Sequence, residues 1–124
     1  MTTTPVAPSP APDAPALDPP LTQRIERTVN RDQNQALIFY GWNGPRLNDP
    51  DLPVWNVLFS YLGSHSGQDP LFTPLRSAGL VYAAGAFLQA GLDPGNAVVY
   101  AATDPAKTTD CRAQLETAIR GVQD

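Results

Sequence analysis

The chain contains few of the side chains that most often carry out chemistry in proteins. Among its 124 residues there is one cysteine, Cys111, and one histidine, His65. A single cysteine excludes an internal disulfide, and a metal site needs several His, Cys or carboxylate ligands at suitable spacing. We therefore expect His65 to be a solvated loop residue and Cys111 to be a small core residue. A metal or redox protein that depends on these two side chains is the least supported hypothesis for the function.

Basic charge and long apolar runs are also scarce. Eight Lys and Arg residues are outnumbered by 12 Asp and Glu residues, for a net charge of -4. Nucleic acids and anionic membrane surfaces both require clustered basic charge, which this chain lacks. No apolar run approaches the roughly 20 residues of a membrane-spanning helix, and the start does not have the pattern of a secretory signal. We therefore expect a cytoplasmic protein with neither a nucleic-acid nor a membrane partner.

Proline is abundant and unevenly distributed. Seven of the 14 prolines lie within the first 20 residues, MTTTPVAPSPAPDAPALDPP. This segment shows no apolar periodicity and cannot bury enough surface to offset the entropy lost on ordering. We interpret residues 1–22 as a disordered, Pro-rich arm and residues 23–124 as one domain, long enough for a single modest core.

The patterning of the domain predicts strands and helices in mixed order. Strands are expected at 25–30, 35–42, 80–89 and 97–102, and the last two are expected to form an antiparallel hairpin. Helices are expected at 53–63, at 70–78 and from about 105 to 122. This order indicates an α+β fold, a two-layer sandwich in which helices cover one face of a mostly antiparallel sheet.

The helix expected at 53–63 has a strongly apolar sequence. An apolar stripe at helical spacing is formed by Trp55, Leu58, Phe59 and Leu62. Further apolar side chains widen this surface, so the helix is expected to be covered on more than one side; they are Val54, Val57 and Tyr61. We expect Asp51 to cap the start of the helix and Gly63 to end it in the left-handed region.

The stretch PLFTPLRSAGLVYAAGAF, residues 70–87, connects a short helix to a strand through Gly79. Asp69 is expected to open the helix, and Pro74 should kink or shorten it because proline has no backbone N–H. Arg76 and Tyr82 lie on either side of the turn. From the pattern alone, Arg76 is a surface cation that favours the helix dipole, and Tyr82 is a sheet residue.

Four segments of the chain occur in an order typical of one family. They are QALIFYGWNGPRLNDPDLPVWNVLFSYLG, SHSGQDPLFTPLR, GLVYAAGAF and AVVYAATDPAKTTDCRAQLETAI. Together they resemble the C-terminal part of a peptidase M16 domain, the family of insulinase, pitrilysin and mitochondrial processing peptidase. The resemblance covers Gln35 to Val122 and implies a partial M16/LuxS-like metallohydrolase domain.

The resemblance also implies a function. Active members of the family use an inverted zinc motif, His-x-x-Glu-His, and this chain has no such motif. The resemblance therefore implies a non-catalytic subunit that has no cofactor of its own and pairs with a zinc-bearing partner. In the family, the half without zinc supplies an Arg and a Tyr that bind the peptide substrate and help to stabilise the developing oxyanion. Arg76 and Tyr82 fall on those two positions.

A second hypothesis stays open from the same residues. Tyr82 follows Arg76 one residue sooner than the corresponding tyrosine usually does in the family, and the chain spans only part of a family domain. These departures favour a degenerate M16 remnant, or a non-enzymatic protein-interaction module that kept the fold and lost the chemistry.

Overall fold

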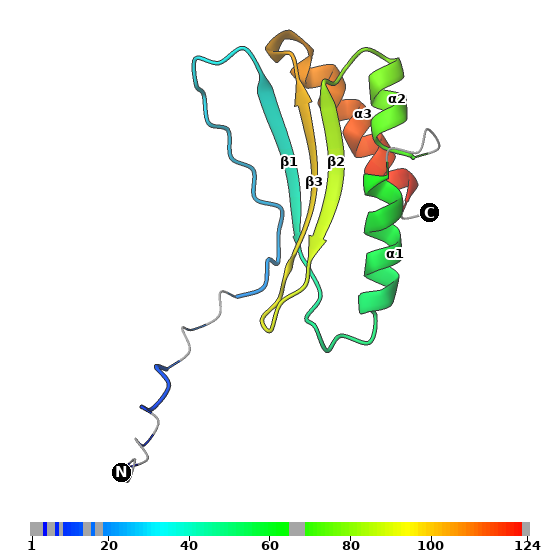
Figure 1. Ribbon diagram of the computed structural model, residues 1–124. Coiled ribbons are helices and arrows are strands. Elements are labelled where there is room, and N and C mark those ends of the chain that lie inside the picture. Colours follow the sequence, from blue (N-terminus) through cyan, green and yellow to red (C-terminus); the bar gives the residue numbers. More distant parts are fainter. Residues whose placement is uncertain are drawn as a thin grey trace.

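The computed structural model describes residues 4, 7, 9–13, 16, 19–64 and 69–122. Its elements, in chain order, are β1 (Ala36–Asn43), α1 (Leu52–Gly63), α2 (Phe72–Ser77), β2 (Ala83–Gln89), β3 (Asn96–Thr103), the 3₁₀ turn η1 (Pro105–Lys107) and α3 (Thr108–Gly121) (Figure 1). From residue 36 onward this is the predicted order. The strand predicted at 25–30 is wrong, because no residue that the structure describes buries its two large apolar side chains: Ile25 is 60% exposed and Val29 is 76% exposed.

The three strands form one antiparallel sheet with β3 in the centre, in the order β1-β3-β2. The predicted hairpin is confirmed, since β2 and β3 are antiparallel neighbours. The register sets Tyr100 of β3 between Phe39 of β1 and Gly85 of β2. Because side chains alternate along a strand, Ala97, Val99 and Ala101 point to the face opposite that of Tyr100.

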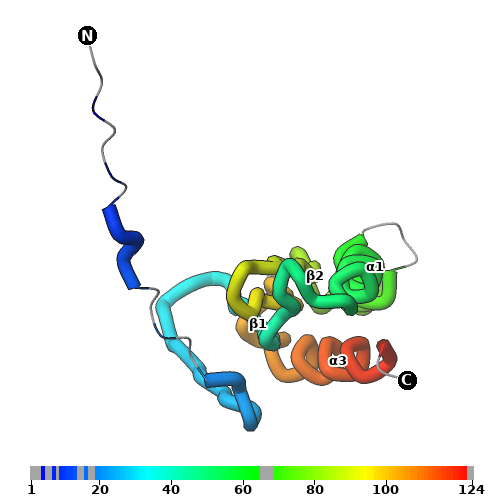
Figure 2. Tube along the Cα trace, turned by 90° about the horizontal axis from the view of Figure 1, so that it is seen from below, coloured from blue at the N-terminus to red at the C-terminus, as the bar shows by residue number. Residues whose placement is uncertain are grey.

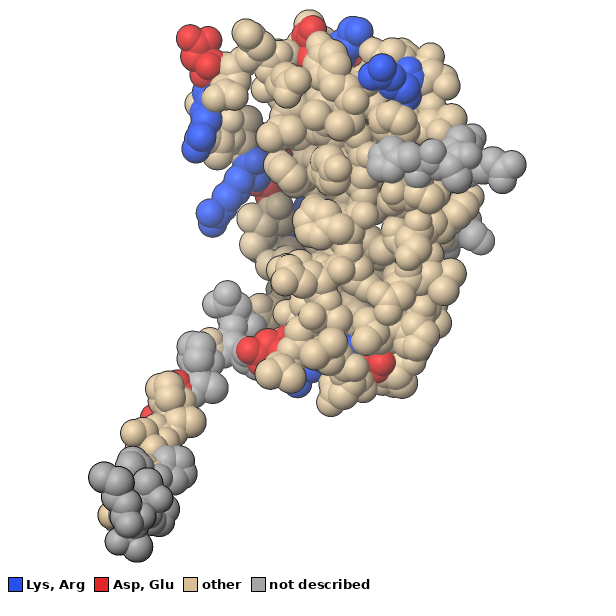
Figure 3. All heavy atoms as spheres, in the orientation of Figure 1, with Lys and Arg blue, Asp and Glu red and all other residues tan. Residues whose placement is uncertain are grey.

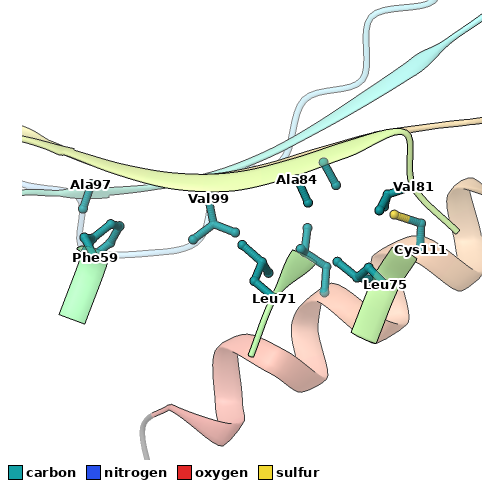
Figure 4. Close-up of a cluster of buried hydrophobic side chains, with 10 residues drawn as sticks. Phe59, Leu71, Leu75, Val81, Ala84, Ala97, Val99 and Cys111 are labelled. Atoms are coloured by element: carbon teal, nitrogen blue, oxygen red, sulfur yellow. The ribbon is translucent and has the colours of Figure 1, made fainter. Parts of the chain in front are cut away.

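The hydrophobic core lies between one face of the sheet and the three helices (Figure 1). In Figure 4 the labelled side chains of β2 and β3 point toward those of the helices. The helices contribute Phe59, Leu75, Cys111 and Leu115, all buried. Each fully buried side chain of Leu or Phe size contributes about 1.5–3 kcal/mol. The predicted α+β, two-layer architecture with a helix-covered antiparallel sheet is therefore confirmed.

Helix α1 packs beside β2, as the end-on view of Figure 2 shows. The predicted apolar stripe faces inward: Phe59 and Leu62 are buried, and Trp55 and Leu58 are partly buried. The expectation that α1 is covered on more than one side is wrong. The opposite side of the helix has no neighbour within the described part of the chain, so its apolar side chains are 66%, 72% and 52% exposed at Val54, Val57 and Tyr61.

The two ends of α1 differ from the expectation. The Asp51 side chain makes no capping hydrogen bond; instead, the Asp49 carboxylate accepts the Asp51 N–H at 2.9 Å. Gly63 does not take up the left-handed conformation. A Cβ atom at residue 63 would lie 2.6 Å from the carbonyl oxygen of Ala86. Glycine is therefore required at this position by the close approach of α1 to β2.

The other face of the sheet is covered by none of the helices described. Phe39, Tyr100 and Phe87 form a row across the three strands, and the ring centroids of Phe39 and Phe87 each lie 6.4 Å from that of Tyr100. The Tyr100 ring covers Gly85, where an added Cβ would lie 3.0 Å from ring atoms. Phe39 is 61% exposed and Phe87 is 47% exposed. An aromatic row thus lies open on this face.

We predict that Gly63→Ala lowers the free energy of unfolding by about 1–3 kcal/mol, because the added methyl group overpacks the contact with β2. Urea unfolding followed by circular dichroism measures the change. The matched control is Gly121→Ala at the end of α3, where nothing lies within 4 Å of an added Cβ. This control should leave stability unchanged or raise it by up to about 1 kcal/mol. Equal stabilities for the two variants would contradict the packing role of Gly63.

Candidate functional site

The two predicted site residues lie at the junction of α2 and β2. We call residues 76–82 the Arg–Tyr corner. Arg76 is exposed in the last turn of α2. Tyr82 is 52% exposed and directly precedes β2 rather than lying within it. Its backbone N–H donates to the carbonyl of Ala102 at 2.8 Å, so the entry to the strand is already fixed to the sheet at Tyr82.

A left-handed turn at Gly79 sets the shape of the corner. Gly79 has a φ of +68°, the one positive φ among the residues described. Its N–H donates to the Arg76 carbonyl at 2.9 Å, and the Leu80 N–H donates to the Leu75 carbonyl at 3.0 Å. These two bonds are the Schellman arrangement that ends a helix. The side chain of Leu75 is buried and Leu80 packs against the same core, so the turn is anchored from inside.

The side chain of Arg76 folds back over this turn. Its Nη1 donates to the carbonyl of Val81 at 3.2 Å, and this carbonyl belongs to the peptide group that carries the Tyr82 N–H. The guanidinium is therefore held close to the backbone of Tyr82. Within residues 19–64 and 69–122, the structure records no other hydrogen bond of the Arg76 side chain and none of the Tyr82 hydroxyl. Most of their donors are therefore available to a ligand.

Helix α2 is held in place by a buried carboxylate. Asp69 is 3% exposed, and its Oδ1 accepts the backbone N–H groups of Leu71 at 3.2 Å, Phe72 at 2.5 Å and Thr73 at 3.0 Å. Its Oδ2 accepts the Thr73 hydroxyl at 2.6 Å. Burial alone would raise the pKa of Asp69, but the hydrogen bonds from Thr73, Phe72 and Leu71 outweigh it and lower the pKa. Asp69 thus opens α2, as predicted, and remains ionised.

Pro74 lies in the first turn of α2 and does not break the helix. It is the third residue of the six-residue helix Phe72–Ser77. N–H groups in the first turn have no partner within a helix, so the missing donor costs nothing there. The helix is shorter than the predicted 70–78, but it continues for three residues past Pro74 and ends at the left-handed Gly79. Arg76 lies at the surface in its last turn.

A second polar cluster, which the sequence reasoning missed, ties the residues before β1 to α3. Glu116 Oε1 accepts the Tyr40 hydroxyl at 2.7 Å and Arg24 Nη2 at 2.9 Å. Arg112 donates to both carboxylate oxygens of Glu26, at 2.6 and 2.8 Å. The hydrogen bond from Tyr40, followed by that from Arg24, lowers the pKa of Glu116 to about 2. In the sequence, Arg112 and Glu116 are recognisable only as charges on the solvated face of the last helix, and no signal links them to the residues before β1.

The remaining candidate groups do not form a site. No group of three or more His, Cys, Asp or Glu side chains in the described part of the chain is placed to hold a metal ion, so these residues do not fit a zinc site. His65 lies outside the residues described. Cys111 is buried, as predicted, and burial raises the pKa of its thiol against the opposing effect of Thr103. None of the helices described is both long and apolar enough to cross a membrane.

Comparison with known proteins matches the chain to a family. A family model described as the peptidase M16 inactive domain matches residues 3–124. No curated protein matches the chain. The matched range includes the Arg–Tyr corner, and it confirms the resemblance carried by the four sequence segments.

We predict that Asp69→Ala lowers the free energy of unfolding by about 1–3 kcal/mol at neutral pH, because it leaves the buried N–H groups at the start of α2 without an acceptor. The pKa of Asp69 is lowered in the folded state. The stabilisation is therefore fully present above the ordinary Asp pKa of about 3.9. It is lost as the pH falls through the lower folded-state value.

Chemical unfolding at pH 7 and at pH 3 tests both statements. Asp51→Ala is the matched control, since the Asp51 side chain makes no capping hydrogen bond; it should change stability by no more than about 0.5 kcal/mol. The difference between Asp69→Ala and the wild type should shrink at the lower pH. Equal losses for the two variants at pH 7 would contradict the capping role of Asp69.

Proposed function

Because this chain belongs to the peptidase M16 family, we propose that it acts as a non-catalytic subunit that pairs with a zinc-bearing M16 partner and helps to hold the peptide substrate. One observation carries the proposal. The chain matches the domain described as inactive and has Arg76 and Tyr82 exposed at one corner, with donors that no described residue uses.

The proposed chemistry is hydrogen-bond donation to a peptide carbonyl. The guanidinium of Arg76 carries five N–H donors and the Tyr82 hydroxyl carries one. Directed at one carbonyl oxygen, they would bind it in the ground state and more strongly as it gains negative charge. The bond from Arg76 to the Val81 carbonyl supports this role, because it fixes the cation before substrate arrives. The partner's zinc would supply the Lewis acid and the activated water.

A second candidate is a degenerate remnant or protein-interaction module with no part in proteolysis. The shortened spacing between Arg76 and Tyr82 favours it, as does the position of Arg76 in the last turn of a helix, where a cation is stabilising without any ligand. The expectation of a cytoplasmic location stays a prediction under either candidate.

We predict that the purified chain cleaves no peptide, with or without added zinc, and that it restores cleavage when mixed with an intact zinc-bearing M16 protein. Arg76→Ala or Tyr82→Phe should lower the restored rate on the order of 10²-fold, the usual cost of one oxyanion donor. Hydrolysis of a quenched fluorescent peptide measures the rate.

Tyr61→Phe is the matched control for Tyr82→Phe, because both tyrosines are 52% exposed and Tyr61 lies in α1, away from the corner. It should restore cleavage as the wild type does. If the wild type and both corner variants restore cleavage equally, the corner has no role in binding. If no mixture is active, the remnant hypothesis replaces the subunit proposal. Zinc-dependent cleavage by the chain alone would contradict both.

A further inference from the structure

Lys107 is the sole lysine of the chain, and its side chain reaches the Arg–Tyr corner from a separate element. Its Nζ donates to the carbonyl of Gly79 at 2.9 Å. Gly79 is the left-handed residue that ends α2, so the first residues of the C-terminal helical segment are tied to the corner. An ammonium group has three donors, and the bond to Gly79 uses one of them.

The backbone around Lys107 is fixed in its own right. The Asp104 carboxylate accepts the Ala106 N–H at 2.8 Å, and the Asp104 carbonyl accepts the Lys107 N–H at 2.9 Å. The Thr108 hydroxyl donates to the Pro105 carbonyl at 2.9 Å. The 3₁₀ turn therefore presents Lys107 from a defined position at the start of α3, and not from a loose loop.

Lys107 and Arg76 converge on the same turn. Lys107 binds the Gly79 carbonyl and Arg76 binds the Val81 carbonyl, and these two carbonyls are only two residues apart in the chain. Figure 3 shows basic side chains, with an acidic side chain beside them, at the end of the molecule where Figure 1 has α2 and the start of α3. None of the ion pairs recorded within residues 19–64 and 69–122 includes Arg76 or Lys107. Both side chains carry a positive charge, so an anion bound between them would be attracted by both.

The cluster around Glu116 shows the contrasting arrangement. There, Arg24 and Arg112 also converge, but the carboxylates of Glu26 and Glu116 lie within 4.0 Å of them and neutralise them. In the sequence, Asp104 and Asp110 flank Lys107, and the acid closest to Arg76 is Asp69, which is buried at the start of α2. The Asp104 carboxylate is engaged in capping, and Asp110 lies exposed in the first turn of α3. No ion pair is recorded for either of them among the described residues.

We propose that Lys107 and Arg76 together bind a carboxylate of the peptide held at the corner, so that this chain selects acidic peptides. The inference rests on the proposed function and specifies its substrate class. Tyr82 and one edge of the Arg76 guanidinium bind a peptide carbonyl. Lys107 and the other edge of the same guanidinium bind a neighbouring carboxylate. An acidic side chain and a C-terminal carboxylate offer the same chemistry.

Three peptides of equal length and otherwise identical sequence test the proposal. The first has a central Glu and an amidated C-terminus, the second replaces Glu with Gln, and the third is the Gln peptide with a free C-terminus. Titration of the full chain, followed by amide nuclear magnetic resonance, detects dissociation constants into the millimolar range. The wild type should bind at least one carboxylate peptide about two- to fivefold more tightly than the amidated Gln peptide. This preference should weaken in 0.5 M salt.

The variants separate charge from structure. Lys107→Met keeps the aliphatic stem and should abolish the preference, whereas Lys107→Arg should retain it. Arg46→Met removes one positive charge from the turn after β1, away from the corner, and should leave the preference unchanged. Asp110→Asn removes a nearby negative charge and should strengthen binding of the carboxylate peptides. Thermal unfolding of each variant shows whether it is folded.

Lys107 also allows a direct readout, because reductive methylation with ¹³C-formaldehyde labels only this side chain and the N-terminal amine. The dimethylated ammonium keeps its positive charge and one N–H, so the label reports the electrostatic attraction of a carboxylate. The methyl signal of Lys107 should shift with the preferred carboxylate peptide and stay unchanged with the amidated Gln peptide. A preference for the central Glu identifies a side-chain carboxylate as the ligand, and a preference for the free C-terminus identifies the terminal one.

The outcomes distinguish this inference from the proposed function. If all three peptides bind equally, and Arg76→Ala and Tyr82→Phe weaken them equally, the carboxylate site is overturned and peptide binding stands. If the preference survives in Lys107→Met, the role of Lys107 is overturned. If no peptide binds to the wild type at millimolar concentration, both the inference and the proposed peptide binding are overturned.

Discussion

The rest of the structure depends on a single buried face of a three-stranded sheet. Its central strand presents Ala97, Val99 and Ala101 to the helices, and each is almost fully buried. These side chains are small, so the helices approach closely, and Gly63 of α1 lies against the β2 backbone for the same reason. Protein interiors pack about as densely as organic crystals, so the helices cannot shift against this small core without creating a void or a clash. The helices, and with them the Arg–Tyr corner, are therefore fixed relative to the strands.

Much of this fold could be predicted from the sequence. Apolar periodicity and turn residues located β1, α1, the β2–β3 hairpin and α3. Each of these elements buries one face, so its apolar residues recur with the period of a helix or of a strand. The segment 25–30 shows the limit of this reasoning. A short alternation of apolar and polar residues forms a strand only if another strand is free to pair with it and an apolar layer covers its apolar side chains. Gly63 shows another limit, because a close approach between distant segments leaves no local signal.

The candidate site was predictable only in part. The motif order identified Arg76 and Tyr82, and the resemblance to the M16 family gave them a role. Lys107 could not be found this way, because its contact with Gly79 joins residues far apart in sequence. Nor could the effect of the shortened spacing be predicted. With this spacing, the Arg76 side chain reaches the carbonyl beside Tyr82.

The order of the strands has a consequence for how the chain folds. The central strand β3 is the last of the three in sequence, and Ala36 pairs with Thr103 across more than half of the chain. Contacts between such distant residues must overcome the entropy of closing a long loop before they are stabilised. During synthesis, β1 and β2 have no strand to pair with until β3 has left the ribosome. Until then the core-facing side chains of β1, Ile38 and Tyr40, stay uncovered, so the chain is most open to chaperone binding before its last strand is made.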